Sequence, residues 1–257
     1  MIPALIIGRK GSTGFPNKNI TNFVGRPLMT YPILAAQNSK FVNDIYISTD
    51  SVEIKKVVED AGGKVIMTSS SHRTGTDRIA EAAKNIECDV VINIQGDEAL
   101  LDPEHIDLIA EEFPKTIKDC HAGILVTKFN KSNSSSDIKA VLNRKNEVLY
   151  LSRTDLPSST RSAVNEMWKA YHIVPFQKSF LLTYTELERS HLELIEYNEY
   201  LRILEHGYKI KAFPVESDSL SVDTEFDLEY VSNKMPYDSS FLLYKDKYNS
   251  WTHTWKE

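Results

Sequence analysis

The chain has 257 residues, 41% of them hydrophobic and 26% charged, with a formal net charge of −6 at pH 7. That length and composition are ordinary for a globular protein that buries one core, or a core and a small lobe. The negative charge argues against a nucleic-acid-binding protein, which usually presents a basic face. Cys88 and Cys120 are too few for a disulfide framework and lie in no metal-ligand spacing, so we expect buried thiols in a reducing compartment.

Export and membrane signals are weak throughout the sequence. The apolar run nearest the N-terminus, residues 4–7, is too short for a signal peptide. No run approaches the roughly 20 apolar residues that a membrane-spanning helix needs. We therefore expect a cytoplasmic protein with neither a membrane nor a nucleic acid as its partner.

The first predicted strand, residues 4–7, leads into a loop at residues 8–19 that holds three glycines and the cations Arg9, Lys10 and Lys18. Glycines allow backbone N–H groups to turn inward into an anion-binding nest, and the cations add positive charge. The loop matches neither the P-loop nor the GxGxxG pattern. A phosphate-binding loop is the favoured interpretation, and a solvated turn with scattered charge is the alternative.

Short strands and helices alternate along the first 110 residues. Strands are predicted at residues 44–48, 64–67 and 90–94, and helices at residues 29–37, 52–61, 79–85 and 106–113. This alternation is typical of βαβ units in an α/β fold with a doubly wound, mostly parallel sheet. Residues 90–94 are apolar except for Asn93, which suits a central strand covered on both faces.

The acidic turn Gln95-Gly96-Asp97-Glu98 follows that central strand. In open parallel sheets the ligand crevice lies beyond the carboxyl ends of the strands. Carboxylates at such a strand end suit Mg²⁺, which prefers oxygen ligands and often shares them with phosphates. An acidic loop that only caps the next helix is an equally open interpretation.

The second half predicts a smaller lobe inserted into the α/β core. A Ser- and Asn-rich stretch at residues 131–137 is expected to be the exposed crossing into this lobe. The expected division is a core of residues 1–132 and 207–257 and an α+β lobe of residues 133–206. The elements predicted from this point are a hairpin with strands at 139–142 and 147–152, a strand at 168–176, helices at 179–184 and 192–205, a strand at 209–215, and a capped helix from 224 to 232.

Seven motifs occur in an order that resembles the CMP-sugar-acid synthetases, which are CTP-dependent cytidylyltransferases acting on 3-deoxy-ulosonic acids. The resemblance covers about residues 6–230 and is nearest to the CMP-Kdo synthetase branch, although the first loop also has features of the CMP-sialic acid synthetases. The motifs are Arg9-x-x-Ser12-Thr13-x-x-Pro16-x-Lys18, His72-x-x-Gly75-Thr76-Asp77-Arg78, Asn93-x-Gln95-Gly96-Asp97-Glu98, Lys139-x-Val141, Ser152-Arg153, Leu192-Glu193-x-Ile195-Glu196-x-x-Glu199-x-Leu201-Arg202, and Val222-Asp223-Thr224.

The resemblance implies a Rossmann-like nucleotidyltransferase fold and a defined reaction. The anomeric hydroxyl of a sugar acid attacks the α-phosphate of CTP, and pyrophosphate leaves. In phosphoryl transfer of this kind the protein mainly positions groups and neutralises charge. Arg9, Ser12 and Lys18 would hold the triphosphate, and Asp97 and Asp223 would be the ligands of the Mg²⁺ cofactor.

The resemblance also assigns residues to the two substrates, and it implies a homodimer formed through the lobe. The nucleotide-binding set comprises Arg9, Ser12, Lys18, Arg73, Gly75, Thr76 and Gln95. The sugar-binding set comprises Gln95, Arg153, His172, Glu193 and Glu196.

Simpler structural roles are open for some of these residues. Asp223 could serve only as a helix cap, and His72 and His172 are lone histidines of the kind that is more often structural. Glu199 and Arg202 lie three residues apart, so a solvated ion pair on the helix surface is favoured for Arg202.

Departures from the family pattern fall on the sugar side. Ala170 aligns with the family's sugar-contacting histidine, and Leu194 follows Glu193 where a polar residue is usual. The expected substrate is therefore Kdo, an amino-Kdo or a similar 2-keto-3-deoxy acid. The alternatives are a CMP-sialic or legionaminic acid type of synthetase, a sugar-1-phosphate nucleotidylyltransferase and a catalytically silent nucleotide-binding relative. The glycan that receives the product, lipopolysaccharide, capsule or another, stays open.

Overall fold

The computed structural model describes residues 2–9, 15, 17–60, 63–164, 166–171, 173–217, 220–222 and 224–245. Twelve strands lie in these ranges: β1 (Ile2–Gly8), β2 (Asn22–Phe23), β3 (Arg26–Pro27), β4 (Val42–Thr49), β5 (Lys64–Met67), β6 (Val90–Gln95), β7 (Ala122–Phe129), β8 (Lys139–Leu142), β9 (Val148–Ser152), β10 (Met167–Tyr171), β11 (Ile173–Gln177) and β12 (Ile210–Val215). The α-helices in the same ranges are α1 (Thr30–Gln37), α2 (Val52–Asp60), α3 (Gly75–Ala83), α4 (Pro103–Glu112), α5 (Lys178–Tyr184), α6 (His191–Glu196), α7 (Leu201–Glu205), α8 (Glu225–Lys234) and α9 (Ser239–Tyr244).

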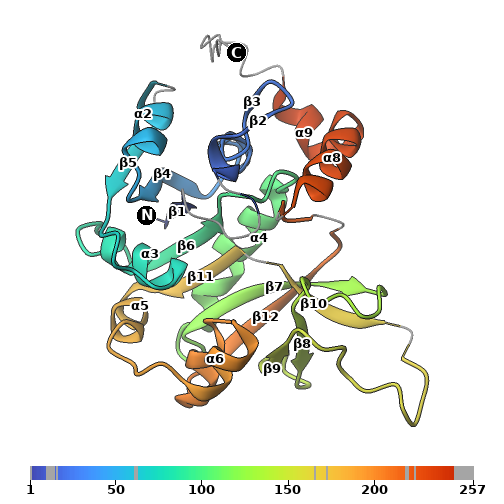
Figure 1. Ribbon diagram of the computed structural model, residues 1–257. Helices are drawn as coiled ribbons and strands as arrows, with labels where there is room; N and C mark the ends of the chain where they lie inside the picture. The colour runs from blue at the N-terminus through green and yellow to red at the C-terminus, as the bar shows by residue number, and fades with distance from the viewer. Residues whose placement is uncertain are drawn as a thin grey trace.

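One mixed sheet organises the molecule, with the strand order β5-β4-β1-β6-β11-β7-β10-β8-β9 and with β12 paired to β7 (Figure 1). The first four strands in this order are mutually parallel. β11 is antiparallel to β6, and β12 is parallel to β7. The predicted α/β class with a doubly wound sheet is confirmed.

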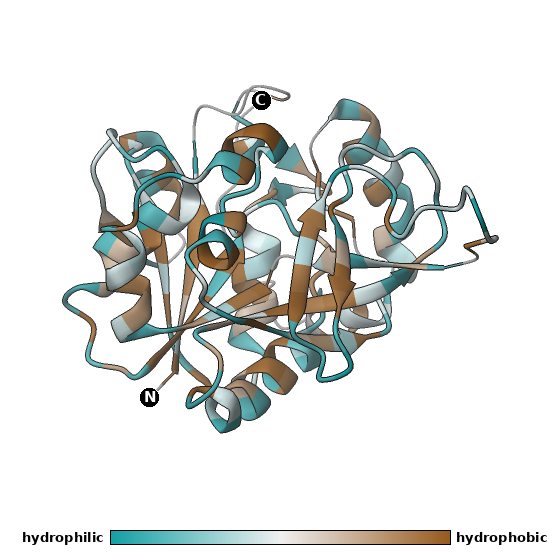
Figure 2. Cartoon of the chain, turned by 90° about the horizontal axis from the view of Figure 1, so that it is seen from below, coloured by the Kyte–Doolittle hydropathy of each residue, from teal (hydrophilic) through white to brown (hydrophobic). Residues whose placement is uncertain are grey.

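Helices cover both faces of the sheet because β1 is apolar on both sides. Leu5 and Ile7 pack in one buried cluster with residues of α3 and α5, whereas Ala4 and Ile6 pack in another with residues of α1, α2 and α4. This alternation follows from the two-residue repeat of a strand. Figure 2 shows the result, with hydrophobic residues concentrated in the strands and hydrophilic residues in the connecting loops.

The single helix predicted at residues 192–205 is wrong, because the chain breaks it into α6 and α7. Tyr197 has a left-handed backbone conformation with φ of 49°, which ends α6. The Asn198 side chain then accepts a hydrogen bond from the Tyr200 N–H at 3.1 Å. Asparagine side chains compete in this way with the helical hydrogen-bond pattern. The break turns residues 197–200 toward the cavity described below.

The single strand predicted at residues 168–176 is also wrong. β10 pairs with β7 and β8, whereas β11 pairs with β6 and β7, so the chain changes neighbours between them. Both strands are buried and apolar, and hydropathy alone cannot mark such a change of partner.

The predicted inserted lobe contributes to the same sheet as the rest of the chain. Ala140, Leu151 and Ala170 share a buried cluster with Leu5 and Ile79 from the first third of the sequence. The boundaries at residues 132 and 207 stay a prediction. Within the described residues, no helix has the length and apolar character needed to cross a membrane.

Gly96 lies where the turn after β6 touches the end of β1. A Cβ at this position would come within 2.3 Å of the Ile7 carbonyl oxygen and 2.5 Å of Asn19 Nδ2. Because Asn19 Nδ2 also donates to that carbonyl at 3.3 Å, the contact joins the two strand ends and η1 (Lys18–Ile20). The close approach requires a residue without a side chain.

We expect Gly96→Ala to lower the free energy of unfolding by about 3 kcal/mol, because backbone atoms would have to move apart. Gly25→Ala is the matched control: its Cβ meets nothing within 4 Å, and its φ of +85° costs only about 1 kcal/mol. Urea denaturation measures both variants. Equal losses for the two would contradict the packing argument.

Candidate active site

A cavity of about 700 Å³ opens at the carboxyl ends of β1 and β6. This is the edge at which the sequence predicted a ligand crevice. Its walls come from segments spread along most of the chain. The residues that the argument below uses are Arg9, Lys18, Gly75, Gln95, Asp97, Glu98, Asp137, Arg153, Lys169, Glu199, Tyr200 and Ser221.

Asp97 forms a tight ion pair with Lys18, with 2.5 Å between the Lys18 Nζ and the carboxylate oxygen. Lys18 Nζ also donates to the Val222 carbonyl at 3.0 Å, and the Val222 N–H donates to the Asp97 carbonyl at 3.1 Å. Three segments that are distant in sequence therefore meet at the acidic turn. Asp223, the other predicted metal ligand, lies outside the described residues.

Glu98 has a different environment from its neighbour Asp97. Glu98 is 1% exposed, and its carboxylate accepts a hydrogen bond from the Ser221 hydroxyl. Its role in the described structure is thus to fasten the segment before Val222 to the turn. Asp97, with 18% of its side chain exposed, is the carboxylate of this turn that faces the cavity more openly.

The donor set fits a magnesium ion that is shared with a bound triphosphate. Mg²⁺ keeps several waters and usually takes only one or two carboxylates together with phosphate oxygens. Asp97 supplies one such carboxylate at the cavity wall. Among the described residues no group of three His, Cys, Asp or Glu side chains could form a complete protein cage for a metal.

The turn at residues 74–77 begins α3, and we call it the nucleotide-side turn because the sequence predicts nucleotide binding by Gly75 and Thr76. Thr74 caps the helix by accepting from the Asp77 N–H at 3.1 Å. A Cβ on Gly75 would lie 2.6 Å from the Ile7 side chain and 3.2 Å from the Arg9 guanidinium, so a larger residue would displace these side chains. Thr76 is fully buried, and its N–H donates to the Glu199 carboxylate at 3.1 Å.

Residues 197–200, which we call the sugar-side turn for the role proposed below, contact the nucleotide-side turn directly, because Glu199 accepts the hydrogen bond from Thr76. Residues of both turns line the cavity. Burial raises the pKa of Tyr200 well above its ordinary value, and the Glu199 carboxylate raises it further. Hydrogen bonding with Gln95 and Thr76 opposes this rise without cancelling it. Tyr200 is therefore a neutral phenol buried in the cavity wall.

Glu199 and Tyr200 were missed as cavity residues because both fell inside a predicted continuous helix. Nothing in the helical pattern marks the break at Tyr197. Once the helix ends there, the two side chains leave the helix surface and line the cavity. Asn198 carries the available signal, since asparagine favours turns over helix interiors.

Arg153 lines the cavity, and its guanidinium is held by backbone carbonyls of Ser135, Glu196 and Tyr197. Glu196 accepts from the Arg153 N–H at 2.9 Å and from the Ser152 hydroxyl at 2.7 Å. Burial alone would raise the pKa of Glu196, but these hydrogen bonds outweigh it and lower the pKa overall. Glu196 therefore supports Arg153 from behind.

Glu193 is buried away from the cavity in an ion pair with Arg202. Its carboxylate accepts from Arg202 Nε at 2.8 Å and Nη2 at 2.6 Å, and the two side chains are 2% and 3% exposed. The solvated Glu199–Arg202 pair favoured from sequence is wrong, because this tertiary contact buries the guanidinium.

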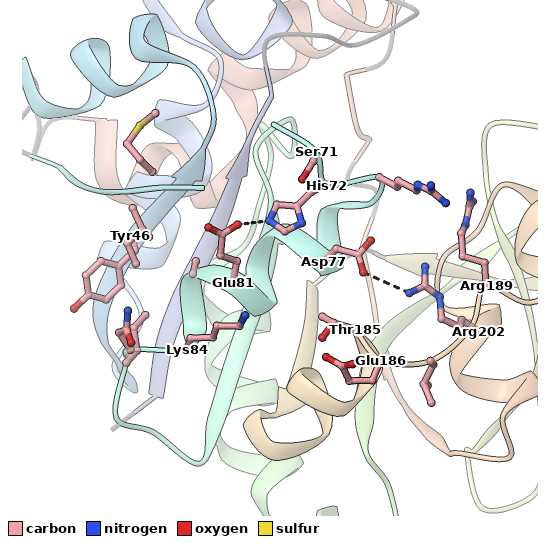
Figure 3. Close-up of a pocket in the computed structure, with 17 residues that line it drawn as sticks. Tyr46, Ser71, His72, Asp77, Glu81, Lys84, Thr185, Glu186, Arg189 and Arg202 are labelled. Carbon is pink, nitrogen blue, oxygen red and sulfur yellow. Dashed lines mark hydrogen bonds and ion pairs between the residues drawn. The ribbon is translucent and has the colours of Figure 1, made fainter. Parts of the chain in front are cut away.

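The other predicted residues lie elsewhere. Arg73 lines a separate cavity of about 960 Å³. His72, Glu81 and Arg189 line the same cavity (Figure 3). Ser12 and His172 lie outside the described residues.

A further charged pair lines the cavity without a sequence prediction. Asp137 and Lys169 are 2.9 Å apart. Burial would raise the pKa of Asp137, but hydrogen bonds from Ser134 and Lys169 lower it overall. Behind this pair the fully buried Lys139 donates to the carbonyls of Ser134, Asp137 and Arg153.

The fold is similar to that of solved nucleotidyltransferases. A glucose-1-phosphate thymidylyltransferase from Bacillus anthracis shares the fold, with a TM-score of 0.67 at 14% identity over 91% of this chain and 94% of that one. The sequence pattern of the cytidylyltransferase family matches residues 3–210. The chain belongs to this family.

Individual relatives are similar over nearly their whole length. A 3-deoxy-manno-octulosonate cytidylyltransferase from Bdellovibrio bacteriovorus is 37% identical over 88% of this chain and 94% of its own. An 8-amino-3,8-dideoxy-manno-octulosonate cytidylyltransferase from Shewanella piezotolerans is 34% identical, with coverage of 92% and 99%. A solved CMP:2-keto-3-deoxy-manno-octonic acid synthetase complexed with CTP gives a TM-score of 0.84 at 28% identity, with coverage of 92% and 98%.

The Glu193–Arg202 pair leads to a pH-dependent stability prediction. Burial raises the pKa of Glu193, but the hydrogen bonds and charge of Arg202, together with its other donors, lower it overall. A carboxyl with a lowered pKa in the folded state stabilises the fold above its unfolded pKa of about 4.3. That contribution is lost as the pH falls through the lower, folded-state value.

We expect Glu193→Gln to cost about 3 kcal/mol of unfolding free energy at pH 7, because Arg202 would stay buried without its counter-charge. The difference from the unsubstituted protein should narrow below about pH 4. Urea denaturation across this pH range is the measurement, with the exposed Glu186→Gln as control. A difference that is constant with pH would contradict the ion-pair assignment.

Proposed function

We propose that this cytidylyltransferase activates 3-deoxy-manno-octulosonic acid (Kdo) with CTP and forms a CMP-sugar and pyrophosphate. Support comes from relatives at 32–37% identity that carry this activity in their names and from the likeness to a CMP-sugar-acid synthetase complexed with CTP. The anomeric oxygen of the sugar bonds to the α-phosphorus as the bond to the bridging oxygen of pyrophosphate breaks.

The junction of Asp97, Lys18 and Val222 is the observation that carries this proposal. It fixes a carboxylate at the strand end, beside Gln95 and close to the cation of Arg9. Arg9 and Lys18 place positive charge where a triphosphate would lie, Arg9 through a planar fork and Lys18 as a compact charge. Ser12 belongs to the same proposed triphosphate site. Gly75 lines the same cavity and belongs to the proposed nucleotide site.

Asp97 and Asp223 are the proposed ligands of Mg²⁺. The ion would neutralise phosphate charge and favour ionisation of the attacking hydroxyl. Support for Asp97 is its position at the cavity wall. Support for Asp223 is its place in the sequence directly after Val222, which is hydrogen-bonded to Asp97.

The sugar would occupy the part of the cavity lined by Gln95, Arg153 and Glu199. Arg153 is held rigidly by carbonyl groups, which suits a residue that orients a carboxylate. Glu196 contributes by supporting Arg153. His172 remains a proposed sugar contact near Ala170. An 8-amino derivative is the second candidate substrate, because named relatives with that activity are equally similar in length and identity.

We expect pyrophosphate release with CTP, Mg²⁺ and Kdo or 8-amino-Kdo, and no release with sialic or legionaminic acid. Asp97→Asn should lower kcat by about 10³-fold. The metal would lose a carboxylate ligand and would no longer stabilise the negative charge of the transition state. Asp119→Asn is the matched control, because it makes the same change at an exposed position away from Asp97 in the sequence. Silence with all four sugars would overturn the proposed function, and full activity of Asp97→Asn would overturn the metal assignment.

A homodimer is also proposed, with the interface over α6 and the edge strand β9. Leu149, Leu194, Ile195 and Tyr197 are between 48% and 84% exposed there. Glu196 accepts hydrogen bonds from Tyr150 and Ser152, so α6 packs against β9. Apolar exposure of this kind, beside an edge strand, suits a partner surface. A cytoplasmic location, where CTP is available, completes the proposal.

Sedimentation velocity at micromolar concentration should show a dimer, and Ile195→Asp should shift it to monomer, because a carboxylate would be buried without a partner. Val52→Asp is the control, since Val52 is 69% exposed on α2 and lies outside the proposed interface. A monomeric unsubstituted protein would contradict the proposed homodimer.

A further inference from the structure

Two turns that line the same cavity are joined at two places. The nucleotide-side turn and the sugar-side turn are more than 120 residues apart in sequence, yet the Thr76 N–H donates directly to the Glu199 carboxylate at 3.1 Å. A second link lies behind this one, away from the cavity. There Arg202 Nη1 is 3.4 Å from the carboxylate of Asp77 (Figure 3).

Arg202 is unusually well fixed for a side chain that lies between two helices. Its guanidinium is 3% exposed, is bound by Glu193 through two hydrogen bonds, and stacks 4.3 Å from the centre of the Tyr184 ring. Glu193 itself closes the capping box of α6 with Ser190. The arginine is therefore rigid with respect to the α6–α7 segment that carries the sugar-side turn.

Asp77 is equally fixed with respect to the nucleotide-side turn. One carboxylate oxygen accepts from the Thr74 hydroxyl at 2.8 Å, and the Asp77 N–H donates back to Thr74 at 3.1 Å. The other oxygen faces Arg202. Asp77 thus belongs to the nucleotide-side turn and Arg202 to α7, which directly follows the sugar-side turn, so displacement of one turn must strain the other or break this contact.

We propose that Asp77 and Arg202 are positioning residues that couple the binding of nucleotide and sugar acid. This inference rests on the proposed function. Neither Asp77 nor Arg202 lines the cavity at the strand ends, so neither side chain is placed to contact the reacting atoms. Arg202 is buried with Glu193 outside that cavity. Ordering of the nucleotide-side turn by CTP sets the position of residues 197–200 through this contact and through Glu199. Such a link meets the requirement that coupling have a physical connection between two distinct sites.

The contact to Asp77 is the part of this network that can be removed cleanly. At 3.4 Å it is longer than the bonds from Arg202 to Glu193, and the Asp77 side chain is 18% exposed. Asp77→Asn keeps an oxygen for Thr74 and places an amide against the guanidinium. The buried Glu193–Arg202 pair stays intact, so the fold should survive the change.

The experiment measures Kdo affinity by calorimetry, with and without saturating α,β-methylene-CTP and Mg²⁺, in the unsubstituted protein and in Asp77→Asn. We expect the nucleotide to strengthen Kdo binding in the unsubstituted protein, and Asp77→Asn to reduce that enhancement about tenfold. Nucleotide affinity in the absence of sugar and the thermal midpoint should both stay near their original values. A purely structural role for Asp77 would instead lower the midpoint and leave the enhancement unchanged.

Glu186→Gln is the matched control. It removes the same charge from an exposed residue, and Glu186 lines the cavity of about 960 Å³ that Asp77 also lines. An equal loss of enhancement in this variant, an unchanged enhancement in Asp77→Asn, or no enhancement in the unsubstituted protein would each overturn the coupling. If Kdo and the nucleotide analogue both fail to bind, the proposed function is overturned as well. Binding of both without mutual enhancement overturns the coupling alone.

Discussion

The parallel pairing of β1 with β6 is the constraint on which the rest of the structure depends. It brings two strand ends so close that the turn after β6 needs a glycine against the Ile7 carbonyl. Everything polar in the cavity is then placed relative to that edge. Arg9 follows one strand, Asp97 follows the other, and Lys18 crosses between them. A wider separation would leave the acidic turn without its cation.

The nucleotide side could be predicted from sequence because its residues sit in short motifs at the ends of apolar strands. Gly75, Gln95 and Asp97 each follow or begin an element whose period is plain, and parallel strands bring such ends to one edge. The structure places all three at the cavity. Asp223 and Ser12 belong to the same kind of motif, but the described residues do not include them.

The sugar side resisted prediction because its geometry is decided by tertiary contacts. Glu199 and Arg202 have the spacing of an ordinary helix-surface pair, but Arg202 is instead buried against Glu193 of α6 and over the Tyr184 ring of α5. The break at Tyr197 likewise depends on a backbone conformation that a helical pattern cannot reveal. Arg202 and Glu193, which were predicted to be a solvated charge and a substrate contact, form a buried ion pair instead. Glu199 and Tyr200 line the cavity.

The bond between Lys18 and the Val222 carbonyl joins residues 204 positions apart. During synthesis the acidic turn can therefore acquire its full set of neighbours only after the ribosome has released the chain as far as Val222. Closing so long a loop is slow compared with forming local helices and parallel βαβ units. The nascent chain can assemble much of its sheet early, yet its catalytic edge is completed only when the last segment docks. A growing polypeptide would thus lack the complete set of contacts at this edge until Val222 has left the ribosome.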